Sequence, residues 1–528
     1  MLSVLLLLPL FFCFILLCLS KRYQYLYRLV TLASTLGALF LSIYLAYLFN
    51  YQTEAYQFFY KADWISLALG SFGKLSIDYC VGIDGISLSL LLLTSFICFI
   101  AVWNSEGVIT EKHKAYYSLI LLLQSALIGC FISLDLFLFY LFFELILLPM
   151  YFLIGIWGGP RKEYASIKFF LYTLLGSIFI LLAIIALYIS GFDPQESASL
   201  RASDIVHTFR IDILQVPGHI LQNTMLAENY PYTIFGLTYR ECTFLLLFVG
   251  FIIKLPSVPL HTWLPDAHVE APTPVSVLLA AILLKVGAYG LIRIAMPIFP
   301  AEALHFSWLI SGLGVASILW GAYNALAQND LKKMIAYSSV SHMGYVLLGL
   351  AAFNIEGLVG AVYQMVSHGL LSAALFLIAG VLYHRTHTRN IDAFGGLAHA
   401  MPMYAAVVTI TFFASLGLPC FSAFVAEIMI FLGAFSSYYI PKWLTIMAIF
   451  GLILTAGYFL WTLQRMFLGK YYVHNLKDKI ADLKYEEVIS FAFLLFLVII
   501  LGVFPQLLIN YLQPACKTIV EMYHIAIY

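Results

Sequence analysis

Charged residues are scarce in this sequence. Of 528 residues, 10% are charged and 63% are hydrophobic, a balance far from that of a soluble globular protein. The composition therefore predicts a membrane protein in contact with a lipid bilayer. Lys plus Arg equals Asp plus Glu, at 27 each, so the net charge gives no reason to expect nucleic acid or an acidic surface as a partner.

Cysteine occurs only as scattered single residues. The eight cysteines form neither a C-x-x-C pair nor a Cys/His set with the spacing of metal ligands. We therefore predict no iron–sulfur cluster, structural zinc or disulfide framework, and no metal or cofactor bound by this chain. A Walker A motif, a G-x-G-x-x-G motif after a strand and a haem signature are also missing. Energy for transport therefore has to come from a partner or an ion gradient.

The N-terminus lacks the features of a cleaved leader. No basic segment precedes the apolar residues 2–20, and the first alanine of the chain is Ala33, so a small-residue cleavage site is absent. We expect this stretch to remain as the first membrane helix. An Arg- and Ser-rich presequence is absent too, which for a mitochondrial protein predicts synthesis inside the organelle.

Long hydrophobic runs dominate the chain instead, and they predict an all-α polytopic membrane protein. About fourteen runs are long enough to cross a hydrocarbon core of roughly 30 Å, at about 2–20, 25–49, 82–104, 114–134, 135–157, 165–191, 241–264, 273–296, 305–327, 331–352, 356–384, 403–436, 443–468 and 485–512. Loops on one face carry seventeen Lys and Arg residues and those on the other carry eight. This asymmetry predicts an even number of spans with both termini on the less positive side.

The runs divide the chain into four parts. Residues 1–110 hold three spans, 111–300 and 301–470 hold two repeats, and 471–528 hold the last span and the tail. We expect five-helix repeats of inverted topology, because each contains a proline-interrupted span with a deep ionisable group. The one long polar insertion, at about 192–240, has no catalytic motif and is interpreted as surface decoration.

Four ionisable residues lie where water is scarce. Glu144 sits half-way along roughly twenty residues fit to span a membrane, and Glu427 lies within the run 403–436. Lys254 follows eleven apolar residues and Lys285 is apolar on both sides. One charge at mid-membrane costs about 2.5–3.5 kcal/mol, so we expect these residues to be paired or functional.

Each lysine has a second interpretation. Lys254 is also compatible with a side chain that snorkels from a helix end, and Lys285 with a fixed structural ion pair. Prolines favour an ion path, because a broken helix exposes backbone groups that only a protein-lined or hydrated cavity satisfies. The helix-breaking prolines are Pro256, Pro259 and Pro265 beside Lys254, and Pro419 eight residues before Glu427.

Histidines add groups that titrate near neutral pH. His368 has apolar residues on both sides and is the strongest candidate for proton transfer. His261, His268 and His342 are candidates for a secondary proton path, and helix–helix hydrogen bonding is the alternative role for each. If Glu144 faces Lys254, each favours the ionised form of the other while desolvation opposes it, so a small movement changes their protonation. Such a pair would be a proton switch.

Five segments carry the most specific motifs: KLPSVPLHTWLPDAHVEAPTPVSVLLAAILLKVGAYGLIR (254–293), FFELILLPMYFLIGIWGG (142–159), DLKKMIAYSSVSHMGYV (330–346), SHGLLSAALFLIAGVLYHRTHTRNI (367–391) and VGIDGISLSLLLLT (81–94). They closely resemble the NADH dehydrogenase (ubiquinone) subunit 4 family, the antiporter-like proton-pumping membrane subunits of respiratory complex I. The likeness covers roughly residues 80–505.

The resemblance implies a fourteen-helix proton channel with two inverted repeats, two discontinuous helices and no redox centre of its own. It also implies a charged axis of Glu144 with Lys254, Lys285 as the link, and His368 leading to Glu427. Such a chain contributes to NADH:ubiquinone reductase (H⁺-translocating) in the respiratory chain. NADH, FMN, iron–sulfur clusters and quinone belong to other subunits, and the implied partners are neighbouring antiporter-like membrane subunits.

Two departures from the family pattern stand out: Ala423, where glycine is common, and Tyr383-His384-Arg385, which replaces an acidic-Arg pattern.

The alternative function is a subunit of a multisubunit sodium/proton antiporter without redox coupling. A third possibility, a purely structural scaffold, would make the deep charges dispensable. The implied location is the mitochondrial inner membrane, with the bacterial plasma membrane as alternative. Both termini are then expected on the intermembrane-space or periplasmic side.

Overall fold

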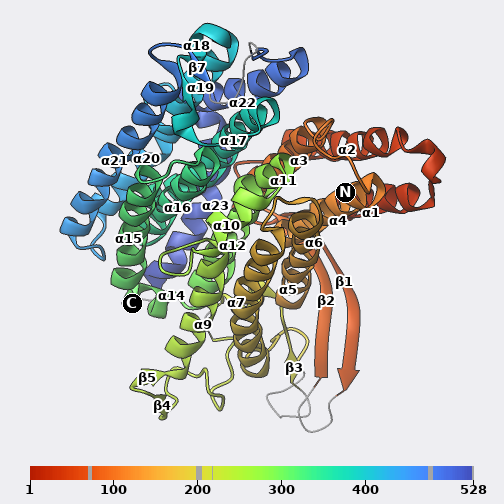
Figure 1. Ribbon diagram of the computed structural model, residues 1–528. Helices are drawn as coiled ribbons and strands as arrows, with labels where there is room; N and C mark the ends of the chain where they lie inside the picture. The colour runs from red at the N-terminus through yellow and green to blue at the C-terminus, as the bar shows by residue number, and fades with distance from the viewer. Residues whose placement is uncertain (69–73, 198–204, 217, 474–479, 526–528) are drawn as a thin grey trace.

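The computed structural model describes residues 1–68, 74–197, 205–216, 218–473 and 480–525. Part of the predicted insertion and three basic residues of the loop count (Arg201, Lys477 and Lys479) lie outside the described residues. The described chain folds into a mostly helical bundle, as predicted (Figure 1).

The N-terminal part combines helices with a β-hairpin. Its helices are α1 (Leu2–Cys18), the 3-10 helix η1 (Lys21–Tyr23), α2 (Leu26–Leu48) and α3 (Gly85–Trp103). Strands β1 (Gln57–Ala68) and β2 (Lys74–Ile83) pair antiparallel, and β3 (Val206–His207) pairs parallel with β2. The hairpin, unforeseen from the sequence, packs through β2 against α4 (His113–Ile132) and α5 (Leu136–Leu145) (Figure 1). It ends where the side chain of Asp84 accepts a hydrogen bond from the amide of Ser87 and caps α3.

The first repeat region contains α4 (His113–Ile132), α5 (Leu136–Leu145), α6 (Leu147–Trp157), α7 (Lys162–Ser190), α9 (Tyr239–Lys254) and α10 (Trp263–Glu270). One further continuous span follows, made of α11 (Thr273–Leu278), the π-helical segment η4 (Leu279–Leu283), α12 (Leu284–Gly290), the π-helical segment η5 (Leu291–Ala295) and α13 (Met296–Ile298). The insertion between α7 and α9 contributes β3, α8 (Ile211–Leu214), β4 (Thr233–Ile234) and β5 (Leu237–Thr238).

The second repeat region contains α14 (Pro300–His305), α15 (Ser307–Leu326), α16 (Leu331–Leu350), α17 (Ile355–Thr386), α19 (Pro402–Ser415), α20 (Ser422–Ser436) and α21 (Lys442–Phe467). Short elements between α17 and α19 are η6 (Ile391–Ala393), β6 (Phe394–Gly395) and α18 (Leu397–Ala400). The chain closes with β7 (Tyr472–Val473), α22 (Tyr485–Val503) and α23 (Gln506–Ile525).

Two spans are discontinuous, as the prolines predict. The chain leaves helical geometry after Lys254 and resumes it at Trp263, so Pro256 and Pro259 lie in the gap. The third proline, Pro265, was expected to interrupt the span, but it lies in the first turn of α10. A missing N–H costs little there, because the first-turn amides have no partner within the helix. The second gap runs between Ser415 and Ser422 and contains Pro419.

Ten helices in the described part of the chain are long and apolar enough to cross a membrane, and α1, α19 and α20 are shorter apolar helices. The number fourteen stays a prediction. In the span Thr273–Ile298 the most apolar stretch is entirely buried, whereas less than 40% of the corresponding stretch is buried in each of α2, α7, α21 and α22. The span Thr273–Ile298 is therefore the centre of the bundle. The four other helices present apolar side chains outward, as lipid contact requires.

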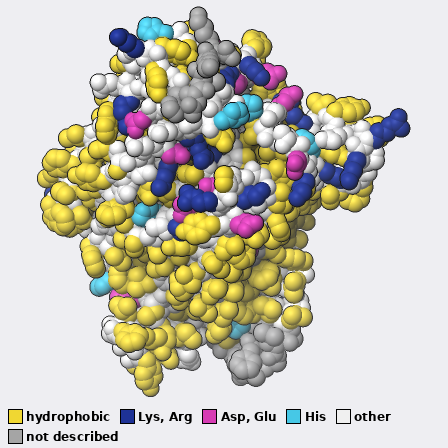
Figure 2. Space-filling view, in the orientation of Figure 1, with side chains coloured by type: hydrophobic (Ala, Val, Ile, Leu, Met, Phe, Trp, Pro, Cys, Tyr) yellow, Lys and Arg dark blue, Asp and Glu magenta, His cyan; other side chains and the backbone are white. Residues whose placement is uncertain are grey.

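The surface differs between the two ends of the bundle. We call the end formed by loops 104–112, 158–161 and 386–401 the basic face, and the opposite end, which carries β1 and β2, the hairpin face. In Figure 2 the Lys, Arg, Asp and Glu side chains gather over the upper part of the molecule, and a broad hydrophobic surface lies below them. This distribution agrees with the loop asymmetry seen in the sequence.

Candidate functional site

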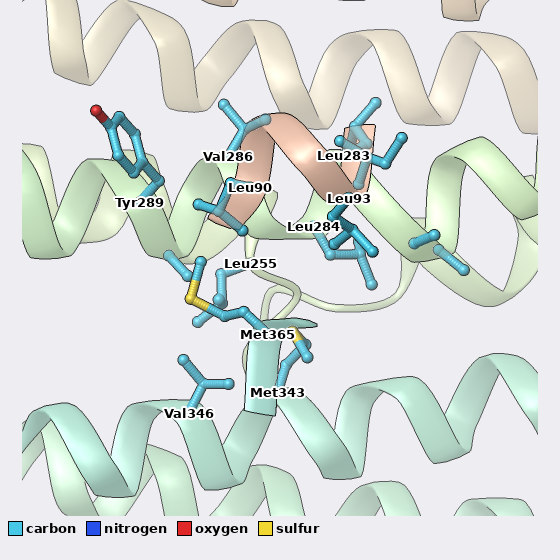
Figure 3. Close-up of a cluster of buried hydrophobic side chains, with 14 of the residues drawn as sticks. Leu90, Leu93, Leu255, Leu283, Leu284, Val286, Tyr289, Met343, Val346 and Met365 are labelled. Atoms are coloured by element: carbon cyan, nitrogen blue, oxygen red, sulfur yellow. The ribbon is translucent and has the colours of Figure 1, made fainter. Parts of the chain in front are cut away.

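Lys285 lies on the central span and contacts the second repeat region directly. Its side chain is fully buried, and Nζ lies 2.8 Å from the carbonyl oxygen of Ala280 and 2.7 Å from Nδ1 of His368 on α17. Ala280 belongs to the π-helical segment η4, and such widened turns recur at functional sites. The chain neighbours of Lys285, namely Leu283, Leu284 and Val286, belong to a cluster of buried hydrophobic side chains (Figure 3).

His342 on α16 continues the series toward α20. Its ring centre lies 5.5 Å from that of His368, and its Nδ1 lies 4.0 Å from Oε1 of Glu427. The amide Nε2 of Gln364 lies 3.2 Å from the same Nδ1. Lys285, His368, His342 and Glu427 therefore form one continuous row, which we call the buried relay. Its members are at most 5% exposed.

Glu427 is held beside the second helix break. Gly417 in that break has φ of +72°, and a Cβ on it would lie 2.3 Å from Oε2 of Glu427. The hydroxyl groups of Ser422 at the start of α20 and Ser367 on α17 lie 2.7 Å apart and join the two helices. Ala423, the departure from the family pattern, is buried in the same turn. The backbone of the break at Gly417 therefore lies directly against the carboxylate of Glu427.

Lys254 and Glu144 lie near each other without pairing directly. Nζ of Lys254 donates to the carbonyl oxygen of Phe143 at 2.9 Å and lies 3.3 Å from the centre of the Phe143 ring. No ion pair joins Lys254 to Glu144 among the described interactions, although Lys254 contacts the residue that precedes Glu144. Glu144 is partly exposed, and its Oε1 is enclosed without a hydrogen-bond partner. The structure therefore places Phe143, the residue before Glu144, against Lys254 in place of a direct Lys254–Glu144 pair.

A local interruption positions Glu144. α5 ends at Leu145 and α6 begins at Leu147, while Ile146 between them keeps helical φ and ψ, so the span continues and only its hydrogen-bond pattern is interrupted. Pro149 accounts for this, since it has no N–H to donate to the carbonyl oxygen of Leu145 four residues earlier. Glu144 is consequently in the last turn of α5, next to a weakened point of its span.

Burial decides between the earlier interpretations of the lysines. Lys254 is 2% exposed, so the snorkelling alternative is wrong. Lys285 has a carbonyl oxygen and an imidazole as its recorded partners, and no carboxylate pairs with it among the described residues. A fixed structural ion pair is therefore not what the structure contains at Lys285.

The other predicted histidines lie outside the buried relay. His261 is in the first helix break, with its ring 6.3 Å from that of Tyr337. His268 on α10 is fully buried and stacks on Phe376 of α17, with ring centres 4.3 Å apart. Both ring nitrogens of His268 lack a hydrogen-bond partner. Only His342 of the three is part of the row.

Two buried charges were not expected from the sequence. Lys332 is one of the seventeen basic residues assigned to loops of one face and Arg293 one of the eight of the other, but their side chains are 5% and 4% exposed. Arg293 pairs with Asp84, and Nζ of Lys332 donates to the carbonyl oxygen of Ala271. Both residues stand near helix ends in the sequence, and only the packing of distant segments buries them. No group of three or more His, Cys, Asp or Glu side chains suited to a metal ion occurs in the described part of the chain.

Comparison with known proteins agrees with this geometry. A family model described as "NADH:quinone oxidoreductase/Mrp antiporter, TM" matches residues 133–455. NADH-quinone oxidoreductase subunit M of Rhodobacter capsulatus is 39% identical over 495 residues, which cover 94% of this chain and 90% of the relative. NAD(P)H-quinone oxidoreductase chain 4 1 of Synechococcus elongatus is 42% identical over 440 residues, covering 82% and 76%.

Solved structures share the whole fold. A chain of respiratory complex I from Thermus thermophilus with bound NADH superposes with a TM-score of 0.81 at 28% identity, covering 99% of this chain and 100% of that one. A chain of the Mrp complex from Dietzia sp. DQ12-45-1b gives a TM-score of 0.79 at 20% identity, with 99% of both chains covered. The second likeness concerns the fold alone.

Proposed function

Because the chain belongs to the family of NADH:quinone oxidoreductase and Mrp antiporter membrane subunits, we propose that it is a proton-translocating membrane subunit of an NADH:quinone oxidoreductase of the complex I type. One observation carries this proposal: a lysine, two histidines and a glutamate form a row inside an apolar bundle. The cost of burying such groups makes a chance row improbable.

The contacts suggest how a proton moves along the buried relay. The Lys285 ammonium donates a proton from Nζ to Nδ1 of His368, which leaves a neutral amine and an imidazolium. His368 then passes a proton to His342, which delivers one from Nδ1 toward Oε1 of Glu427. No hydrogen bond joins His368 to His342 among the described contacts, and the 4.0 Å from His342 to Glu427 exceeds a hydrogen bond. A bridging water or a side-chain rotation therefore completes each of these two steps.

Glu144 and Lys254 act in this proposal as the switch that loads the relay. While Glu144 is ionised it favours the ammonium form of Lys254, and protonation of Glu144 removes that attraction. Moving one proton against about 100 mV costs about 2.3 kcal/mol, and the chain has no energy-releasing motif of its own. We infer that electron transfer from NADH to quinone, through FMN and iron–sulfur clusters in other subunits, supplies the drive.

The sodium/proton antiporter alternative has weaker support. The full-length relatives near 40% identity carry NADH-quinone oxidoreductase names, whereas the Mrp chain is 20% identical. Co-purification with flavin and iron–sulfur subunits separates the two functions, because a sodium/proton antiporter without redox coupling does not require such partners.

For the location, we propose the mitochondrial inner membrane with both termini in the intermembrane space, and the corresponding bacterial alternative is the plasma membrane with both termini in the periplasm. Ser3 lies 3.0 Å from the hydroxyl of Tyr79 on β2, and Lys517 on α23 pairs with Glu54 just before β1. Both contacts support chain ends on the hairpin face, which is the less positive one.

Substitution of the link residue tests the proposal. In Lys285→Ala complexes reconstituted into vesicles, we expect proton pumping and the coupled quinone reductase rate to fall about tenfold or more, with complex assembly preserved. Lys470→Ala, at an exposed lysine of the basic face, is the matched control. An unchanged proton-to-electron ratio would overturn the relay, and a loss of complex abundance alone would make Lys285 structural.

A further inference from the structure

Buried polar side chains continue along the central span from Lys285 toward the hairpin face. Lys285, Tyr289 and Arg293 follow each other at intervals of four residues, so they lie on successive turns of one side of this span. All three are at most 4% exposed. The guanidinium carbon of Arg293 lies 5.7 Å from the centre of the Tyr289 ring, so the two side chains are neighbours. Arg293 stands about 12 Å of helix rise beyond Lys285.

Hydroxyl groups lie between Lys285 and the hairpin face. The hydroxyl of Tyr289 donates to the carbonyl oxygen of Phe131 at 3.1 Å and lies 2.9 Å from Oγ of Ser87 on α3. The backbone amide of Ser87 donates to Oδ1 of Asp84 at 2.9 Å. A hydroxyl group both donates and accepts hydrogen bonds, so linked hydroxyl groups can pass a proton. Protons on the central span thus have a second direction besides the buried relay.

This series ends at an ion pair and a partly exposed tyrosine. The guanidinium of Arg293 pairs with Oδ2 of Asp84, and its Nη1 donates to the hydroxyl of Tyr56 at 3.0 Å. Tyr56 directly precedes β1 and is partly exposed. Tyr289, Ser87, Asp84, Arg293 and Tyr56 therefore form a continuous series of contacts from the central span to the hairpin face, which we call the polar column.

The insertion between α7 and α9 holds the backbone of Arg293. Gln215 directly follows α8, is 9% exposed, and donates from Nε2 to the carbonyl oxygen of Arg293 at 2.7 Å. This part of the insertion, which the sequence suggested was surface decoration, therefore reaches the central span. Together with the pairing to Asp84, it fixes Arg293 in the π-helical segment η5 at the end of the polar column.

The chemistry of arginine makes it a stop for protons. A lysine or a histidine can release a proton inside a protein, whereas a guanidinium stays protonated and has no acceptor. The charge of an arginine in a polar pore also excludes protons. A structural clamp is the alternative role, but apolar replacements of buried ion pairs are often neutral or stabilising. Stability alone therefore does not explain a buried pair at this place.

We propose that the Arg293–Asp84 pair is a barrier that blocks proton movement between the hairpin face and Lys285 along the polar column. A proton on Lys285 then leaves through His368, and protons from the hairpin face do not return by the shorter way. This inference rests on the proposed function and adds what keeps the buried relay free of leak.

The passive proton leak of the complex tests the barrier. The double substitution Arg293→Gln with Asp84→Asn removes both charges, leaves no buried charge unpaired, and retains a residue able to cap α3. In the whole complex reconstituted into vesicles without NADH, we expect an imposed pH gradient to decay about tenfold faster in this variant than in the unsubstituted complex. Assembly and the quinone reductase rate should be retained.

The matched control is Arg240→Gln with Glu302→Gln, which removes another ion pair of the hairpin face outside the polar column. We expect its pH gradient to decay at the rate of the unsubstituted complex. Unchanged decay in Arg293→Gln with Asp84→Asn, or equal acceleration in the control, would overturn the barrier.

A third substitution tests the route of the leak. Tyr289→Phe, added to the double variant of Arg293 and Asp84, retains the ring beside Phe131 and removes the hydroxyl. We expect it to return the decay toward the rate of the unsubstituted complex, and a leak that persists would come from loosened packing and overturn the route.

Pumping by Lys285→Ala keeps the barrier separate from the relay. If Lys285→Ala stops pumping while the double variant of Arg293 and Asp84 holds its pH gradient, the relay stands and the barrier is wrong. If the double variant leaks although Lys285→Ala pumps normally, the barrier is supported and the relay is wrong.

Discussion

The two helix breaks carry ionisable groups in different ways. In the first, Lys254 is the last residue of α9, where free carbonyl groups and the helix dipole favour a cation. In the second, Glu427 lies one turn and a half inside α20 and its carboxylate packs on Gly417 of the break itself. Similar proline-interrupted spans therefore produce a lysine held by backbone in one half and a glutamate held against backbone in the other.

The connections of the two halves differ as well. Glu427 continues through His342 and His368 to Lys285, with each member close to the next. Lys254 contacts Phe143, the residue before Glu144, and forms no ion pair with Glu144 among the described interactions. We infer that the second half is a proton pathway, because its ionisable side chains follow one another closely enough for proton transfer. We infer that the first half is a switch, because the charge of Glu144 changes the protonation of Lys254.

The largest effect is expected from Glu427→Gln. The amide keeps the shape of the side chain but cannot accept the proton at the end of the relay, so pumping should fall about tenfold or more. The measurement is the proton-to-electron ratio of the complex in vesicles. Glu356→Gln, at an exposed position at the start of α17, is the control. An unchanged ratio in Glu427→Gln would remove the glutamate from the pathway.

Glu144→Gln should have the next largest effect. Removing the charge that acts on Lys254 leaves the relay intact, so we expect pumping and the coupled quinone reductase rate to fall by a factor of about three to ten, since one partial charge interaction of about 1 kcal/mol is lost. Assembly should be preserved, because Glu144 is partly exposed and makes no ion pair among the described contacts. Full coupled activity in this variant would contradict the switch.

How far the sequence could predict this site depends on the kind of signal. Glu144, Lys254, Lys285 and Glu427 are visible because a charge inside an apolar run is costly, and the prolines mark the breaks for the same local reason. The part played by Phe143 is invisible, since its carbonyl group and ring meet a side chain 111 residues away. The burial of Lys332 and Arg293 likewise depends on segments that only the fold brings together.

The hairpin shows a second limit. Residues 57–83 contain no apolar run long enough to span a membrane, so a search for spans assigns them no structure. In the fold, β1 and β2 pair with each other as an antiparallel hairpin on the hairpin face. The π-helical segments beside Lys285 are also hidden from the sequence, because their widened turns depend on how the central span packs.

The smallest effect is expected from Phe143→Leu, and it separates the two modes of holding Lys254. Leucine retains the carbonyl group that accepts from Nζ and loses only the ring 3.3 Å away. A cation–π contact of about 0.5–1 kcal/mol corresponds to a factor of roughly two to five, so pumping should fall by that amount with assembly intact. Phe142→Leu changes the neighbouring buried ring, which has no recorded contact with Lys254, and should leave pumping unchanged. If Phe143→Leu and Phe142→Leu reduce pumping equally, packing explains the effect. If Phe143→Leu reduces pumping as much as Glu144→Gln does, the Phe143 ring itself transmits the charge change of Glu144 to Lys254, because loss of either side chain then removes the same effect.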